Sequence, residues 1–179
     1  MQWWSEWLPT WNSSAIIPET RAILSSDLCL FTDASGKGLG AIYGDQWIQA
    51  DWQRGFADED IDFKEAFAIV AAACKWGYRW PGRRLVFVTD NKPFTEIWEK
   101  GSTPSPAIMK LVRKLFLIAV HGQFSVAFKH IEGQYNPVAD ALSRFQERRF
   151  RLLHPTADAH PTNIPPEAWN LHSHHQVGP

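Results

Sequence analysis

The sequence contains little cysteine and almost no net charge. Its two cysteines, Cys29 and Cys74, both lie in apolar stretches. Two such residues do not make a secreted disulfide framework, so we expect buried free thiols in a reducing intracellular compartment, cytoplasmic or nuclear. The formal net charge of −1 means that the chain is not a polycation. Binding of nucleic acid would therefore need a local basic patch or metal ions.

Long apolar runs are also absent. No stretch approaches the length of a membrane span, and the first residues (MQWWSEWLPTW) are too polar for a signal peptide. We therefore expect no membrane partner. With 179 residues, of which 45% are hydrophobic, the chain has the material for one domain of ordinary size and some additional tail.

Two short apolar segments each end in a Thr-Asp pair. Residues 28–35 (LCLFTDAS) and 85–91 (LVFVTDN) have the composition of strands buried on both faces, and they deliver Asp33 and Asp90. A buried carboxylate needs a partner. The pair predicts a shared site at one edge of a sheet. The alternative is that each aspartate only caps the turn or helix that follows it.

The other segments alternate between strand and helix patterns. In chain order they predict strands at 40–44 and 46–52 joined by a Gly44-Asp45 turn, a helix at 60–76, the strand at 85–90, helices at 93–100 and 105–121, a strand at 124–130 and a helix from Asn136 to Phe145. Three strands followed by this alternation predict an α/β fold with a mixed sheet and helices on both faces.

The two ends of the chain differ from the middle in composition. We expect a leader at 1–24, the folded domain at 25–152 and a largely irregular tail at 153–179. The leader holds Trp3, Trp4, Trp7 and Trp11. These fall on one helical face, which would dock on this domain or on one upstream. Prolines make helix or strand improbable in the tail, and three histidines near its end are expected to be unstructured. They are His172, His174 and His175.

Four carboxylates have positions that suggest a common site. Glu65 lies between Ile61 and Ile69 on the apolar stripe of its helix, although it could instead reach solvent from the border of that stripe. With Asp33, Asp90 and Asp140 it would form a cluster that repels itself unless cations neutralise it. Hard oxygen ligands select Mg²⁺ or Mn²⁺, and two such ions promote displacement at a phosphodiester.

Four sequence motifs carry a resemblance to a known family. In order they are TDAS, DFKEAFAIVAA, VTDN and HIEGQYNPVADALSR. Together they resemble the ribonuclease H domain of retrotransposon reverse transcriptases of the gypsy and DIRS types, and the leader and tail look most like the DIRS type. The resemblance covers roughly residues 1–170 and implies a ribonuclease H-like fold, which we expect here with a five-stranded mixed sheet.

The resemblance also implies an activity and a set of site residues. Asp33, Glu65, Asp90 and Asp140 match the family positions that bind two Mg²⁺ ions, with Mn²⁺ as a substitute, and cut the RNA strand of an RNA–DNA hybrid. A reverse transcriptase domain in the same polyprotein is the implied partner. His130 lies ten residues before Asp140, as does the family histidine linked to product release or proton transfer; alternatively it only ends the last strand.

Several polar residues near these positions are weaker candidates for substrate contact. Ser35 and Asn91 would touch phosphate or a 2′-hydroxyl, although Asn91 could equally cap a helix. Asn136 matches a family position but is already explained as an N-cap, and Arg144 is either a phosphate ligand or a surface charge. Arginines 148, 149 and 151 could add affinity for a nucleic-acid backbone or form a solvated helix face.

Two departures from relatives concern the grip on substrate. Between Lys100 and Pro106 there is no room for the basic helix and loop by which some cellular relatives hold the hybrid. Asp62 stands where relatives often have an amide. We therefore expect weak hybrid binding by the domain alone.

Two other functions compete with hybrid cleavage. One is a catalytically inactive domain of the same fold that serves a polyprotein as a structural or interaction module. Retention of all four carboxylates argues against it. The other is a DNA-cutting nuclease or strand-transfer enzyme of this fold, which would share the acidic cluster but not the NPVADALSR ending.

Overall fold

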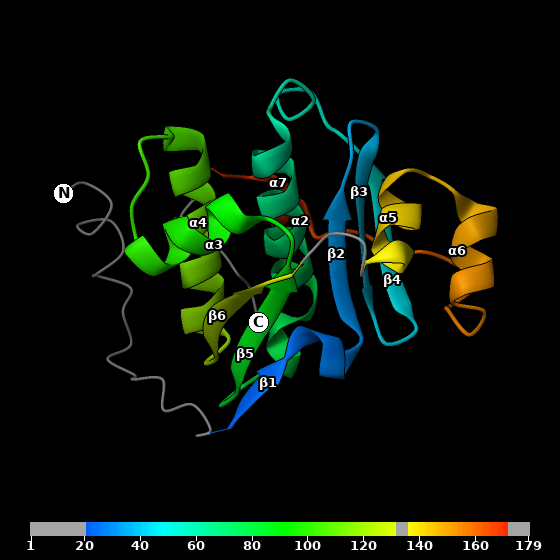
Figure 1. The fold of residues 1–179 in the computed structure, drawn as a ribbon, viewed down its shortest axis with the longest axis horizontal. Coiled ribbons are helices and arrows are strands. Elements are labelled where there is room, and N and C mark those ends of the chain that lie inside the picture. Colours follow the sequence, from blue (N-terminus) through cyan, green and yellow to red (C-terminus); the bar gives the residue numbers. More distant parts are fainter. Residues whose placement is uncertain (1–20, 132–135, 172–179) are drawn as a thin grey trace.

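The computed structural model describes residues 21–131 and 136–171 and contains two three-stranded sheets (Figure 1). The antiparallel sheet consists of β2 (Leu30–Ala34), β3 (Gly38–Tyr43) and β4 (Gln46–Asp51). The parallel sheet has the order β1-β5-β6 and consists of β1 (Ala22–Leu24), β5 (Arg84–Thr89) and β6 (Ser125–His130). The Gly44-Asp45 turn joins β3 to β4 as predicted, with Gly44 at φ +59.

The prediction of one five-stranded sheet is wrong in its strand count, because an additional strand, β1, forms ahead of the first predicted strand, in residues that we assigned to the leader. β1 is followed by the 3₁₀ helix η2 (Ser25–Leu28), and Cys29 then adopts a left-handed conformation with φ 49. β1 pairs with β5, and β2, which follows Cys29, pairs with β3. Cys29 is exposed, so the prediction that both thiols are buried is also wrong.

The described residues contain the predicted helices together with shorter helices that the sequence did not predict. They are α2 (Ile61–Trp76), the 3₁₀ helix η3 (Gly77–Arg79), α3 (Lys92–Lys100), α4 (Pro106–His121), α5 (Pro137–Ser143), α6 (Glu147–Leu153) and α7 (Pro166–Trp169). The side chains of Asp60, Asn91 and Ser105 accept hydrogen bonds from backbone N–H groups in the first turns of α2, α3 and α4. Gly101, at φ 67, ends α3.

Side chains that alternate along β3 enter two separate hydrophobic clusters. Ala41 belongs to the larger one, which includes α2, α4 and the buried residues Leu85 and Phe87 of β5. Ile42 belongs to the smaller one, with Leu142 of α5 and residues of α6. The two faces of the antiparallel sheet are therefore covered by α2 and α5. Figure 1 shows α2 at the centre of the molecule, near both sheets.

The last predicted helix is interrupted. We expected one helix to include Phe145 and to extend to the arginines at 148, 149 and 151. Instead, α5 ends at Ser143 and α6 begins at Glu147. Phe145 between them has φ 57, which ordinary helix residues do not adopt. The chain therefore changes direction after α5, and α6 packs beside it.

The described part of the tail, residues 153–171, follows the domain surface. The backbone N–H groups of Asp158 and Thr162 donate to the carbonyls of Asp45 (2.8 Å) and Trp47 (2.7 Å), which lie in the turn and in β4. The Trp47 indole donates to the carbonyl of Asp158 (2.7 Å). The tail thus covers the free edge of β4.

The described part of the tail includes a short helix, α7, where proline content made a helix improbable. In α7, Ala168 is fully buried, and the ring of Trp169 lies 4.8 Å from that of Phe67 in α2. Residues 1–20 of the leader, with its four tryptophans, and the histidines at 172, 174 and 175 lie outside the described residues, so what we predicted for them stays a prediction. No helix in the described ranges is long and apolar enough to cross a membrane.

Candidate active site

The strands bring several predicted site residues to their carboxyl ends. Asp33 lies near the end of β2, opposite Gly40 of β3. Asp90 directly follows β5. His130 is the exposed last residue of β6, in register with Thr89 of β5, so it lies at the same edge as Asp90.

Glu65, in the second turn of α2, interacts electrostatically with Asp33 and Asp90. Burial, followed by the negative charges of Asp90 and Asp33, raises the pKa of Glu65 to about 8. Asp62 adds a smaller effect of the same sign. Glu65 is therefore mostly protonated at neutral pH in the absence of a cation.

Asp33 is the most central member of the group. Burial raises its pKa to about 6; the charges of Asp140 and Asp90 act in the same direction, whereas a hydrogen bond from Ser143 opposes them. That bond runs from the Ser143 hydroxyl to Oδ2 of Asp33 and measures 2.5 Å. Asp33 thus interacts with Asp140 of α5 and with Asp90, which follows β5. The hydrogen bond from Ser143 of α5 holds its side chain in place.

Asp140 differs from the other three because it is neutralised by arginines. Nε of Arg144 donates to Oδ1 of Asp140 (2.5 Å), and an Nη of Arg149 donates to Oδ2 (2.6 Å). Although burial acts in the opposite direction, these hydrogen bonds and charges keep the pKa of Asp140 below its ordinary value. Its carboxylate is ionised but already occupied on both oxygens.

The chemistry of this group fits a hard divalent cation. Burial and the negative charges of neighbouring aspartates raise the pKa values of Asp33 and Glu65, and a positive ion would relieve this effect. Oxygen donors are the ligands that Mg²⁺ and Mn²⁺ prefer. In the ranges that the structure describes, however, no three carboxylate, histidine or cysteine side chains are close enough to enclose an ion as they stand. Binding would require the carboxylates to move closer together and Asp140 to leave its arginines.

The proposed substrate ligands Ser35 and Asn91 are both buried and hydrogen-bonded within the protein. The Ser35 hydroxyl donates to the carbonyl of Ser143 (2.7 Å). The Asn91 side chain caps α3 and donates to the carbonyl of Asp62 (2.9 Å). Both residues position the elements that carry the carboxylates.

Asn136 and Ser143 also make hydrogen bonds within the protein, to Thr32 and to Asp33. Asn136 is the residue before α5, but its side chain makes no cap bond. Its Nδ2 donates to the carbonyl of Thr32 (2.8 Å), and its buried Oδ1 has no hydrogen-bond partner. The sequence reasoning missed Ser143, although its place three residues after Asp140 puts it on the same helical face. It also missed the contact of Arg149 with Asp140, which depends on the break at Phe145.

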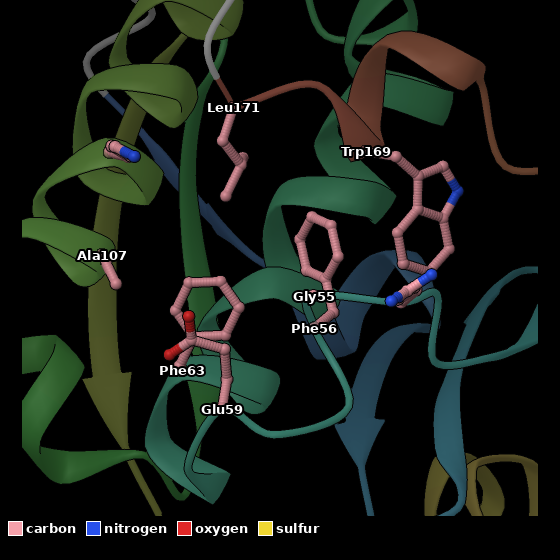
Figure 2. Close-up of a pocket in the computed structure, with 9 residues that line it drawn as sticks. Gly55, Phe56, Glu59, Phe63, Ala107, Trp169 and Leu171 are labelled. Carbon is pink, nitrogen blue, oxygen red and sulfur yellow. The ribbon is translucent and has the colours of Figure 1, made fainter.

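A cavity of about 260 Å³ lies apart from this group (Figure 2). Phe56, Phe63 and Trp169 form its aromatic part, and Glu59 is the carboxylate in its lining. Phe63 is two residues from Glu65, which places the two side chains on different faces of α2. None of the four clustered carboxylates lines the cavity.

Neither a protein-family model nor a curated protein sequence matches this chain. Its architecture does match solved structures. The N-terminal RNase H domain of Rv2228c from Mycobacterium tuberculosis, solved as a fusion with maltose-binding protein, is 14% identical, with a TM-score of 0.52 over 70% of this chain and 98% of that one. The chain has a ribonuclease H-like fold. RNase H1 from the halophilic archaeon Halobacterium salinarum NRC-1 is similar as well, at 13% identity and a TM-score of 0.51 over 72% and 98% of the two chains.

Proposed function

We propose that this ribonuclease H-like domain is a metal-dependent endoribonuclease that hydrolyses the RNA strand of RNA–DNA hybrids during reverse transcription of a retroelement. The observation that carries the proposal is that Asp33 and Asp90, from two different sheets, both raise the pKa of Glu65 in α2, while Asp90 also raises that of Asp33. The fold neighbours are ribonuclease H domains by name, which supports the same reaction class.

Asp33, Glu65, Asp90 and Asp140 are the residues that would hold two Mg²⁺ ions, with Mn²⁺ as a substitute. When bound, such ions supply an activated water and stabilise the leaving oxygen of the phosphodiester. The Ser143 hydroxyl orients the Asp33 carboxylate. No described residue other than these four carboxylates is assigned to hold an ion.

We propose that the exposed His130 exchanges protons with the substrate. It ends β6 beside the strand that leads to Asp90, and it lies on the solvent side of that edge. Histidine is the side chain that most often transfers protons in general acid–base catalysis. Loss of the imidazole should therefore slow turnover without abolishing metal binding.

Substrate affinity depends on partners outside this domain. Only five residues, 101–105, separate α3 from α4, so no basic helix and loop is present there to grip a hybrid. With a net charge of −1, the domain attracts nucleic acid weakly overall. We propose that a reverse transcriptase domain of the same intracellular polyprotein holds the hybrid, while this domain cuts it.

Cleavage of a labelled RNA–DNA hybrid in Mg²⁺ and in Mn²⁺ tests the proposal. Duplex DNA and duplex RNA serve as substrate controls. Asp90→Asn should abolish cutting, whereas Asp58→Asn, which changes an exposed loop carboxylate, should leave it intact. Cutting that persists in Asp90→Asn would refute the assignment of this site.

The inactive-domain alternative has one observation in its favour. Asp140 is bound by two arginines, and no three described carboxylates enclose an ion as they stand. A structural module predicts that the folded wild-type protein neither cuts the hybrid nor binds Mn²⁺ in a titration. A domain that only lacks its polymerase partner would still bind Mn²⁺.

A further inference from the structure

The ion-paired group formed by Asp140, Arg144 and Arg149 joins two helices across a break in the chain. Arg144 follows α5 and contacts Asp140 one helical turn earlier, whereas Arg149 belongs to α6 and reaches back over nine residues. Both carboxylate oxygens are used, one by each guanidinium. The left-handed conformation of Phe145 makes the second contact possible, because it turns α6 toward α5.

We propose that Arg144 and Arg149 form a latch that keeps Asp140 unavailable to metal until the phosphate backbone of a nucleic acid takes over the two guanidiniums. This inference rests on the proposed function, because it assumes that Asp140 is a metal ligand. It adds two residues that control when the metal site becomes complete. Arg149 in particular becomes a positioning residue, since it acts on the metal through Asp140.

The exposure of the group favours exchange with a phosphate. The side chains of Arg144 and Arg149 are 53% and 47% exposed, so both can be approached from solvent without unfolding. A guanidinium binds carboxylate and phosphate oxygens with the same planar geometry, so one anion can replace the other. The side-chain oxygen of Gln146 also accepts a hydrogen bond from Arg149 (2.8 Å), which keeps this arginine oriented after it leaves Asp140.

The latch makes metal binding and nucleic-acid binding help each other. Without nucleic acid, a cation must displace the arginines before it can use Asp140, which weakens its affinity. With phosphate on the arginines, that cost has already been met, so the cation binds more tightly. By the same linkage, bound cation releases the arginines and tightens the grip on phosphate.

The size of the effect follows from the exposure of the pairs. An exposed ion pair is typically worth less than 1 kcal/mol, which corresponds to a change in affinity of up to about fivefold. Removing one arginine should therefore tighten metal binding by about two- to fivefold when nucleic acid is absent. It should also reduce the extra tightening that nucleic acid brings.

Calorimetric titration with Mn²⁺ tests this without any measurement of activity. Wild type, Arg149→Gln and Arg144→Gln are titrated alone and with a hybrid whose RNA strand is 2′-O-methylated and remains intact on a gel. Arg148→Gln is the matched control, because it removes the same charge from the same helix at a position for which no contact with Asp140 is found among the described residues. Circular dichroism confirms that each variant is folded.

The latch predicts that Arg149→Gln and Arg144→Gln bind Mn²⁺ more tightly than Arg148→Gln in the absence of hybrid, and that they gain less when hybrid is added. Equal affinities in Arg149→Gln and Arg148→Gln would overturn the latch, while Mn²⁺ binding itself would leave the proposed function standing. Absence of Mn²⁺ binding in every folded variant would overturn both.

Discussion

Replacement of Gly40 by alanine should separate α5 from the sheet that carries Asp33. Gly40 lies in β3 directly opposite Asp33. A Cβ at this position would clash with Cβ of Leu142 and lie 2.7 Å from the backbone nitrogen of Ser143 and 3.0 Å from the carbonyl of Ala139. Two of these three atoms belong to the α5 backbone, which cannot move aside by changing a rotamer.

The expected loss of stability is the balance of two effects. Insertion of a methyl group into a packed contact costs about 1–3 kcal/mol. Alanine in a strand recovers about 0.5–1 kcal/mol over glycine, because the unfolded chain has less freedom to lose. We expect a net loss of about 1–2 kcal/mol, or a melting temperature lower by roughly 2–8 °C for a chain of this size.

The same displacement should affect the candidate active site. Ser143 and Asp140 both lie in α5, so a shift of this helix breaks the hydrogen bond to Asp33 and misplaces one carboxylate. A shift on the order of 1 Å costs about a hundredfold in rate at a well-positioned site. Hybrid cleavage by Gly40→Ala should therefore fall far more than the loss of folded protein explains.

Urea unfolding and hybrid cleavage measure the two effects. The control is Gly36→Ala, since a Cβ at Gly36 meets nothing within 4 Å and its backbone does not require glycine. That variant should stay within about 0.5 kcal/mol of wild type and keep its activity. If Gly40→Ala is as stable and active as Gly36→Ala, the close packing of α5 on β3 is not what positions the site.

Three further results are expected. The pKa of Glu65 is raised to about 8 in the folded protein, so the folded protein keeps a proton that the unfolded chain loses above its ordinary pKa of 4.5. The contribution of this proton to stability is therefore present at low pH and is lost as the pH rises toward 8. Mg²⁺ should raise the melting temperature more at pH 8.5 than at pH 6, and an equal rise at both pH values would contradict the raised pKa. Trp169→Ala should cost about 2–4 kcal/mol in urea unfolding, because it removes a ring packed on Phe67, and an unchanged midpoint would show that α7 is not part of the folded unit. Asn91→Ala should lower the free energy of unfolding by about 1–3 kcal/mol, because it removes the cap of α3 and the hydrogen bond to the Asp62 carbonyl. Asn91→Asp keeps the oxygen that caps the helix and should lower the free energy of unfolding less. Equal losses of stability in the two variants would argue against the cap.

Local patterns in the sequence predicted most of the elements. Apolar runs ending in Thr-Asp located β2 and β5, and capping residues located the starts of α2, α3 and α4. Because these signals depend only on residues that are close together in the sequence, they can be recognised without knowledge of the fold. The placement of Asp33 and Asp90 at strand ends followed from them and is confirmed, whereas their catalytic role stays a prediction.

Features that depend on distant contacts could not be predicted in this way. β1 is only three residues long, and its pairing with β5 joins segments about sixty residues apart, so no local pattern marks it. Phe145 is not a residue type that usually adopts positive φ, so nothing in the sequence announced the break before α6. The tail was expected to be irregular from its prolines, but its packing depends on the few apolar residues between them, such as Ala168 and Trp169.

The position of the tail along β4 has a consequence for the order of folding. The hydrogen bonds from Asp158 to Asp45 and from Thr162 to Trp47 each close a loop of more than a hundred residues. During synthesis, β2, β3 and β4 can form a hairpin ladder long before Thr162 has left the ribosome. For that interval the edge of β4 presents unpaired backbone groups that invite pairing with another chain. We therefore expect nascent or truncated chains that lack the tail to aggregate, even though every carboxylate of the candidate active site is already present.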